Sequence, residues 1–144
     1  MTLINLRILV VDDDPHMRRL VDLILRGVGF TELRAAADGY EALELMRAWK
    51  PDLLLVDYVM GGLDGIAFTR LVREQTDQGD KRPAIIIMTG YSELWRLDEA
   101  KKAGANEFLV KPFNAKALLG RIGRVTSQDV TLAEADRQHA EQPA

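Results

Sequence analysis

The chain has 144 residues, with 19 lysines and arginines, 22 aspartates and glutamates, and no cysteine. One domain is expected at this length, which is sufficient to bury a full hydrophobic core. The lack of cysteine excludes disulfide frameworks, thiolate zinc sites and cysteine nucleophiles, and it suits a reducing, cytoplasmic compartment. A formal net charge of −3 also argues against direct nucleic-acid binding, which needs clustered lysine and arginine.

The negative charge is concentrated at the C-terminus. Residues 126–144 contain four acidic side chains and one arginine, a balance of −3, so residues 1–125 sum to zero. Only Val130 and Leu132 in this tail are large and apolar, too few to offset the entropy of ordering it. We therefore expect one domain over residues 1–125 and an acidic extension over 126–144 that is disordered or a frayed helix.

Short apolar runs alternate with stretches whose apolar residues lie three and four positions apart. The runs predict strands at 6–11, 30–36, 53–56, 84–88 and 107–110. Those at 53–56 and 85–88 are continuously apolar, which indicates strands covered on both faces, as in a parallel sheet. The stretches between and after the runs predict five helices, marked by Met17, Leu20, Val21, Ile24 and Val28; by Ala42, Leu43 and Met46; by Phe68, Leu71 and Val72; by Leu94, Leu97 and Lys101; and by Leu118, Leu119, Ile122 and Val125.

Several residues indicate where the helices begin and end. Asp14 followed by Pro15 is typical of an N-cap and a first helical turn, and the first helix is expected to stop at Gly27. Pro51 breaks the second helix and Gly104 ends the fourth. Five strand–helix units predict a doubly wound α/β domain with a five-stranded parallel sheet, in which ligands bind beyond the carboxyl ends of the strands. No signal peptide or membrane insertion is expected, since no run of apolar residues is long enough.

Carboxylates, a threonine and a lysine follow the predicted strands. Asp12 and Asp13 follow the first strand, Asp57 the third, Thr89 the fourth and Lys111 the fifth. Neighbouring carboxylates raise one another's pKa in a semi-buried cleft, and a hard divalent cation resolves this conflict. Oxygen donors without nearby histidine or cysteine favour Mg²⁺ or Mn²⁺ over Zn²⁺. A phosphoryl group suits the same site, because the cation and Lys111 offset its charge and Thr89 donates a hydrogen bond.

These residues lie in strings that resemble the receiver domain of bacterial two-component response regulators. The resemblance runs from about residue 6 to 125, with the strings in the family's order. It implies a (βα)5 flavodoxin-like fold with strand order 2-1-3-4-5, as in the chemotaxis regulators of this family. The strings are Ile8-Leu9-Val10-Val11-Asp12-Asp13, Pro51-Asp52-Leu53-Leu54-Leu55-Val56-Asp57, Leu63-Asp64-Gly65, Met88-Thr89-Gly90, Ala103-Gly104-Ala105 and Lys111-Pro112-Phe113.

The resemblance implies that the chain is a phosphorylation-activated switch. Asp57 is then the phosphoacceptor, which receives a phosphoryl group from a sensor histidine kinase or a histidine phosphotransfer protein. Asp13 would ligate Mg²⁺ directly and Asp12 mostly through water, with Asp57 and the backbone carbonyl of Val59 as further ligands; Mn²⁺ is expected to substitute. Such a domain catalyses only its own phosphorylation and dephosphorylation and is not an enzyme in the usual sense.

The resemblance also assigns the residues that transmit the signal. Lys111 would bridge the phosphoryl group, and its peptide bond to Pro112 is expected to be cis. Thr89 would move to bind the phosphoryl group while the aromatic ring of Phe108 turns inward. The output would be binding of a downstream protein through the fourth helix, fifth strand and fifth helix, by a monomer or a phosphorylation-dependent dimer.

Some positions depart from the family pattern. Val59 and Tyr91, two residues after Asp57 and Thr89, offer no carboxylate or amide to orient an attacking water, and both could shield the acyl phosphate. A slowly hydrolysing phospho-form is therefore expected. Tyr91 is a candidate partner contact. Trp95 is another, because it lies off the apolar stripe of its helix.

Two alternatives remain open. A Mg²⁺-dependent aspartate-nucleophile phosphohydrolase of the haloacid dehalogenase type uses similar residues, but it needs a second aspartate two positions after its nucleophile. Asp57 is followed by Tyr58 and Val59, whereas Asp12 and Asp14 have the spacing but precede a proline. A DNA-binding regulator is disfavoured because its second domain does not fit in residues 126–144, although the same sequence is compatible with a segment of a longer regulator.

Overall fold

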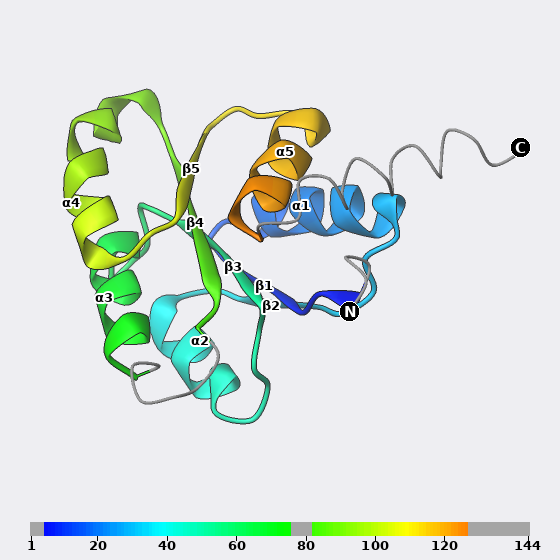
Figure 1. Cartoon of the computed structure of the whole chain (residues 1–144), viewed down its shortest axis with the longest axis horizontal. Coiled ribbons are helices and arrows are strands. Elements are labelled where there is room, and N and C mark those ends of the chain that lie inside the picture. Colours follow the sequence, from blue (N-terminus) through cyan, green and yellow to red (C-terminus); the bar gives the residue numbers. More distant parts are fainter. Residues whose placement is uncertain (1–4, 76–81, 127–144) are drawn as a thin grey trace, which may run out of the picture.

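The computed structural model describes residues 5–75 and 82–126, so the tail predicted over 126–144 lies almost entirely outside the described residues. Strands and helices alternate along the chain (Figure 1). A short 3₁₀ helix, η2, precedes α4. The elements are β1 (Ile8–Val11), α1 (Pro15–Val28), β2 (Leu33–Ala36), α2 (Gly39–Met46), β3 (Leu53–Asp57), α3 (Gly65–Gln75), β4 (Ala84–Thr89), η2 (Tyr91–Arg96), α4 (Leu97–Ala103), β5 (Glu107–Val110) and α5 (Ala115–Val125).

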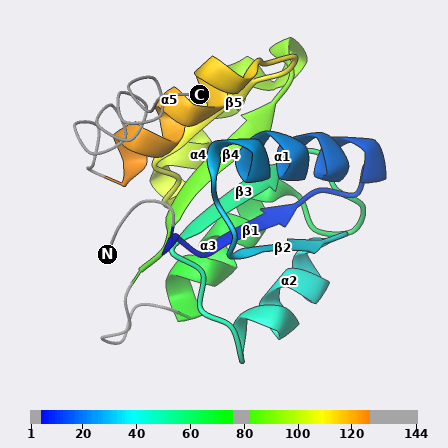
Figure 2. The ribbon, with the colours of Figure 1, turned by 90° about the vertical axis from the view of Figure 1, so that its right-hand side faces the viewer.

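The described residues form one five-stranded parallel sheet with the strand order β2-β1-β3-β4-β5. Helices α1 and α5 cover one face of the sheet, and α2, α3 and α4 cover the other (Figures 1 and 2). The predicted doubly wound α/β fold and its strand order 2-1-3-4-5 are therefore confirmed.

The central strand β3 shows why its sequence is continuously apolar. Leu53 and Leu55 pack into the cluster beneath α1 and α5, whereas Leu54 and Val56 pack into the cluster beneath α2, α3 and α4. All four side chains are buried because successive residues of a strand point to opposite faces and helices cover both faces here. The prediction of a strand buried on both sides is confirmed.

The strand boundaries differ from the predicted ones by a few residues. Strands β1 and β2 begin later than predicted, although Leu6 and Phe30 are buried. Phe30 belongs instead to the end of α1, since its amide donates to a carbonyl of the last helical turn. Strands β3 and β4 extend one residue further, so Asp57 and Thr89 are the last residues of their strands.

Helix α1 corrects two predictions. Gly27 lies inside the helix, and the residue that ends it is Gly29, which has a φ of 118° and donates its amide to the carbonyls of the last turn. Leu20, predicted on the buried stripe, is 44% exposed, whereas Leu25 is fully buried. The buried side of α1 passes through Val21 and Leu25, four residues apart, and Leu20 lies about 100° away from it.

The predicted fourth helix is divided into η2 and α4. Gly104 ends α4 with a φ of 116°, as predicted. The residues of α4 that are buried are Ala100 and Ala103, so its contact with the sheet is made by small side chains. No helix among residues 5–75 and 82–126 is long and apolar enough to cross a membrane.

Candidate functional site

The register of the parallel strands brings four predicted site residues to one edge of the sheet. Strands β1 and β3 pair so that Asp12 and Asp57 are level. Asp57 pairs with the residue before Thr89, and Thr89 pairs with the residue before Lys111. The amide of Lys111 also donates to the carbonyl of Thr89 at 2.7 Å. Residues from four strands thus meet at the carboxyl edge, as the sequence predicts.

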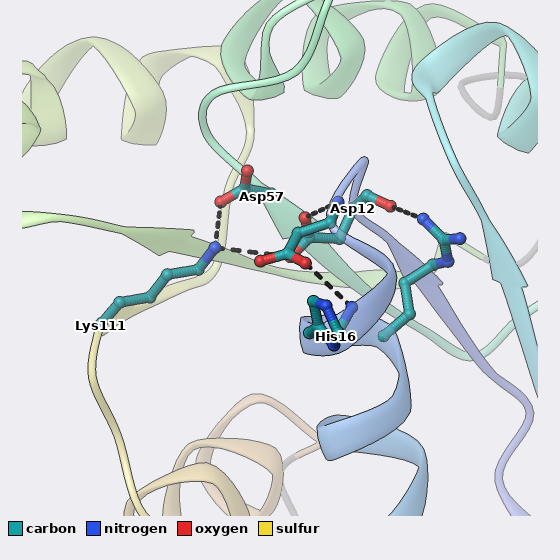
Figure 3. Close-up of polar contacts among 6 residues, drawn as sticks. Asp12, His16, Asp57 and Lys111 are labelled. Atoms are coloured by element: carbon teal, nitrogen blue, oxygen red, sulfur yellow. Dashed lines mark hydrogen bonds and ion pairs between the residues drawn. The ribbon is translucent and has the colours of Figure 1, made fainter.

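Among the described residues, Asp12, Asp13 and Asp57 form a cluster in which one carboxylate oxygen of each lies within 4.8 Å of the others. Asp12 is fully buried and Asp57 is 7% exposed, whereas Asp13 is exposed. The Nζ of Lys111 lies 2.6 Å from Asp57 Oδ1 and 3.4 Å from Asp12 Oδ2. Figure 3 shows the ammonium group lying between these two carboxylates.

Burial changes the acidity of the groups in this cluster. Burial of Asp57 is the largest cause of a pKa raised to about 6, an effect that Lys111 opposes and that the charges of Asp12 and Asp13 increase. Burial lowers the pKa of Lys111, but its hydrogen bonds and ion pairs with Asp57 and Asp12 outweigh this and leave the pKa raised. Ionising Asp57 is therefore costly in this buried position, even with the Lys111 ammonium beside it.

The loop between β1 and α1 holds Asp12 in place. Asp12 Oδ1 accepts the amide of Asp14 at 2.9 Å. Asp14 in turn caps α1 by accepting the amide of His16, which confirms the predicted N-cap. Arg18 Nη1 donates to the backbone carbonyl of Asp12 at 2.7 Å. This contact of Arg18 was not predicted, because an arginine on a helix has no sequence signal for a bond to the preceding loop.

Gly65 allows α3 to begin directly against the end of β3. A Cβ at this position would lie 2.8 Å from the carbonyl oxygen of Asp57 and 3.0 Å from the Cα of Tyr58. The Gly65 amide donates to the carbonyl of Tyr58, and Asp64 caps the helix by accepting the amide of Ala67. Any larger residue at position 65 would push the backbone of Asp57 out of place. The sequence predicts this segment only as a turn and helix entry.

Residues 8–123 match the family model of the response regulator receiver domain. This chain belongs to the response regulator receiver family. It is 36% identical over 120 residues to the chemotaxis protein CheY of Pseudomonas aeruginosa, a match that covers 83% of this chain and 95% of that protein. Receiver domains act as phosphorylation switches in two-component signalling, which favours this interpretation over the hydrolase alternative.

Solved structures of receiver domains are similar to this one. The structure of CheY4 of Vibrio cholerae has a TM-score of 0.76 and 33% identity, covering 84% of this chain and 98% of that chain. The receiver domain of the sensor histidine kinase PA1611 of Pseudomonas aeruginosa has a TM-score of 0.74 and 28% identity, covering 85% and 98%. That second structure holds a magnesium ion coordinated in its active-site cleft.

The remaining residues that the resemblance assigns to signalling lie on β4 and β5 or directly after β5. The buried Thr89 hydroxyl donates to the carbonyl of Gly90 at 3.2 Å. Phe108 is partly buried against the cluster beneath α2, α3 and α4, and its carbonyl accepts from Arg121 Nε at 2.9 Å. The peptide bond between Lys111 and Pro112 is cis, as predicted.

Three residues of the receiver domain are predicted to shield the site or to contact a partner. The side chain of Val59 is 58% exposed, so it is not packed over Asp57. Trp95 is 80% exposed, which confirms that it lies off the apolar side of its helix. The side chain of Tyr91 lies outside the part of the chain that the structure describes. Contact of Trp95 and Tyr91 with a partner stays a prediction.

Proposed function

We propose that this receiver domain is a signalling switch that accepts a phosphoryl group on Asp57 from the phosphohistidine of a sensor histidine kinase or a histidine phosphotransfer protein. The observation that carries the proposal is the buried Asp57 carboxylate, held 2.6 Å from the Lys111 ammonium and beside the buried Asp12. An Asp57 oxygen attacks phosphorus, the P–N bond to the donor breaks, and the imidazole leaves with the electron pair. Lys111 then faces the negative charge of the acyl phosphate.

Magnesium fits the acidic cluster of this site. The cluster offers oxygen donors from Asp12, Asp13 and Asp57, three acidic side chains beside the Lys111 ammonium. We assign these three carboxylates and the backbone carbonyl of Val59 as the groups that hold Mg²⁺, with Mn²⁺ able to replace it. When bound, the cation supplies positive charge to the carboxylates and to the phosphoryl oxygens.

Replacing Asp13 by asparagine is expected to weaken Mg²⁺ binding at least tenfold, because the variant loses one of the three charges that attract the cation. Isothermal titration calorimetry of the unphosphorylated protein measures this affinity. The matched control is Asp98→Asn, which removes the same charge from an exposed site on α4 and should leave the affinity within a factor of two. Equal affinities for Asp13→Asn and the unchanged protein would contradict the assignment.

The phosphoryl group is proposed to act through Thr89 and Phe108. The Thr89 hydroxyl breaks its hydrogen bond to the carbonyl of Gly90 and donates to a phosphoryl oxygen instead. The ring of Phe108 turns further into the apolar cluster beneath α2, α3 and α4, which it already contacts. The changed surface is formed by α4, β5 and α5, and it binds a downstream protein rather than nucleic acid. We propose that the switch works in the cytoplasm, as a monomer or as a dimer that forms on phosphorylation.

Incubation with Mg²⁺ and acetyl phosphate tests the proposal. The protein is expected to gain the mass of one phosphoryl group, and Asp57→Asn is expected to gain none. The control Asp98→Asn removes an exposed carboxylate and should be phosphorylated like the unchanged protein. No modification of the unchanged protein, or equal modification of Asp57→Asn, would refute the proposal. Steady release of phosphate from a phosphomonoester would instead favour the hydrolase alternative.

A further inference from the structure

Tyr58, the residue directly after Asp57, is held by an arginine at the end of η2. Arg96 Nη1 donates a hydrogen bond to the hydroxyl of Tyr58. The guanidinium carbon of Arg96 also lies 5.4 Å from the centroid of the Tyr58 ring, within the range of a cation–π contact. The two residues are 38 positions apart, so this contact joins the loop after β3 to the segment after β4.

The orientation of Arg96 is fixed by its other contacts. Its Nε and Nη2 donate to the two carboxylate oxygens of Glu99 at 2.9 and 2.8 Å, the paired geometry in which a guanidinium is held most firmly. Glu99 also lies 3.6 Å from Arg70 Nη2 on α3. The ring of Trp95 lies on the guanidinium of Arg96 at 5.7 Å. Arg96 therefore reaches Tyr58 from a position that α4 and α3 both support.

The position of this contact relates it to the switch. Arg96 is the last residue of η2, and η2 begins immediately after Thr89 and Gly90. Gly90 is the N-cap of η2, and its carbonyl accepts the Thr89 hydroxyl. The segment is thus attached at its start to Thr89 and at its end to Tyr58. A movement of the Thr89 hydroxyl toward Asp57 breaks its hydrogen bond to Gly90, and any accompanying displacement of η2 must break the contact at Arg96.

We propose that the hydrogen bond between Arg96 and Tyr58 is a latch that keeps η2 and the start of α4 in the arrangement described here and opposes the switch. Arg96 and Tyr58 act as positioning residues, since they act through η2 on Thr89. The effect on switching rests on the proposed function of Asp57, whereas the effect on η2 does not. Loss of the latch makes the activated arrangement easier to reach.

The first test uses the protein without any ligand. Tyr58→Phe removes one hydroxyl and keeps the ring that packs against the core. Hydrogen–deuterium exchange of the amides in residues 94–100 is expected to become about fivefold faster, because one hydrogen bond to a charged group is lost. Tyr40→Phe, which removes a hydroxyl from an exposed ring on α2, should change nothing. Unchanged exchange in Tyr58→Phe would overturn the latch.

The second test measures the affinity for beryllofluoride, a phosphoryl mimic, in the presence of Mg²⁺. Tyr58→Phe and Arg96→Met are each expected to bind it about fivefold more tightly. The double variant should bind no more tightly than Arg96→Met, because both changes remove the same contact. Unchanged or weaker binding by Tyr58→Phe, or effects that simply add in the double variant, would overturn the proposal.

The two tests separate failure of the latch from failure of the proposed function. The proposed function requires that the unchanged protein binds beryllofluoride and that Asp57→Asn does not. If this difference is absent, the proposed function fails and the latch has no switch to oppose. The exchange measurement then still decides whether Tyr58 holds η2. If the unchanged protein responds and Tyr58→Phe matches it in both tests, the proposed function stands and the latch is refuted.

Discussion

Replacing Lys111 by methionine is expected to slow the phosphorylation of Asp57 by acetyl phosphate about a hundredfold. The Lys111 ammonium contacts Asp57 at 2.6 Å and Asp12 at 3.4 Å, so it is already in place when negative charge arrives on the phosphoryl group. Loss of one such prepositioned donor typically costs 10²–10³ in rate. Methionine keeps an unbranched side chain of similar length and removes the charge together with the hydrogen bonds that Nζ donates. Intact-mass spectrometry at saturating Mg²⁺ follows the appearance of the phosphorylated protein.

Lys116→Met provides the matched control for this experiment. Lys116 is exposed on α5, so its replacement removes the same charge from the chain without touching the acidic cluster. Its phosphorylation rate should stay within a factor of two of the unchanged protein. A Lys111→Met protein that is phosphorylated at nearly the normal rate would show that the ammonium has no part in the transfer.

Asp57→Asn is expected to stabilise the metal-free protein at pH 7 but not at pH 4. Burial raises the pKa of Asp57 from 3.8 to about 6, which means that the fold disfavours the ionised carboxylate. The stability contributed by this group is fully present below pH 4 and is lost as the pH rises through 6. Asparagine is neutral throughout and avoids this loss. The gain at pH 7 should be about 1–2 kcal/mol, because the cost of ionising buried Asp57 disappears while Lys111 loses an ion-pair partner.

Thermal unfolding in the presence of a chelator, at pH 4 and at pH 7, measures this difference. Adding Mg²⁺ at pH 7 should reduce the advantage of Asp57→Asn, since the cation offsets the charge of the unchanged site. Asp98→Asn, at an exposed carboxylate, should have the same small effect at both pH values. An equal advantage of Asp57→Asn at both pH values would exclude ionisation of Asp57 as its cause.

The fold and the main site were predictable because they depend on patterns that the chain repeats. A continuously apolar run such as 53–56 is compatible with a strand covered on both faces, and parallel strands align their carboxyl ends. The polar residues that follow four of the apolar runs therefore had to lie at the same edge of the sheet. Asp57, Thr89 and Lys111 meet for this reason, and no individual contact had to be foreseen.

The contacts that hold the site were not predictable in the same way. Arg18 donates to the carbonyl of Asp12, and Arg96 donates to the hydroxyl of Tyr58, but neither arginine differs in sequence from an ordinary surface arginine. The end of α1 was also ambiguous, because Gly27 and Gly29 both suit a helix end and only the packing of the completed fold selects the second. Local pattern identifies the element, whereas its exact end depends on tertiary contacts.

The wide separation of the site residues along the chain has a consequence for newly made protein. Lys111 meets Asp12 across 99 residues and Asp57 across 54, so its ammonium reaches the two buried carboxylates only when β5 has joined the sheet. Contacts of such long range form only after the entropy of closing the intervening chain has been overcome. An unfinished copy on the ribosome carries Asp57 without its lysine. If Lys111 takes the proposed part in phosphoryl transfer, only copies whose synthesis and folding have passed β5 can be phosphorylated efficiently.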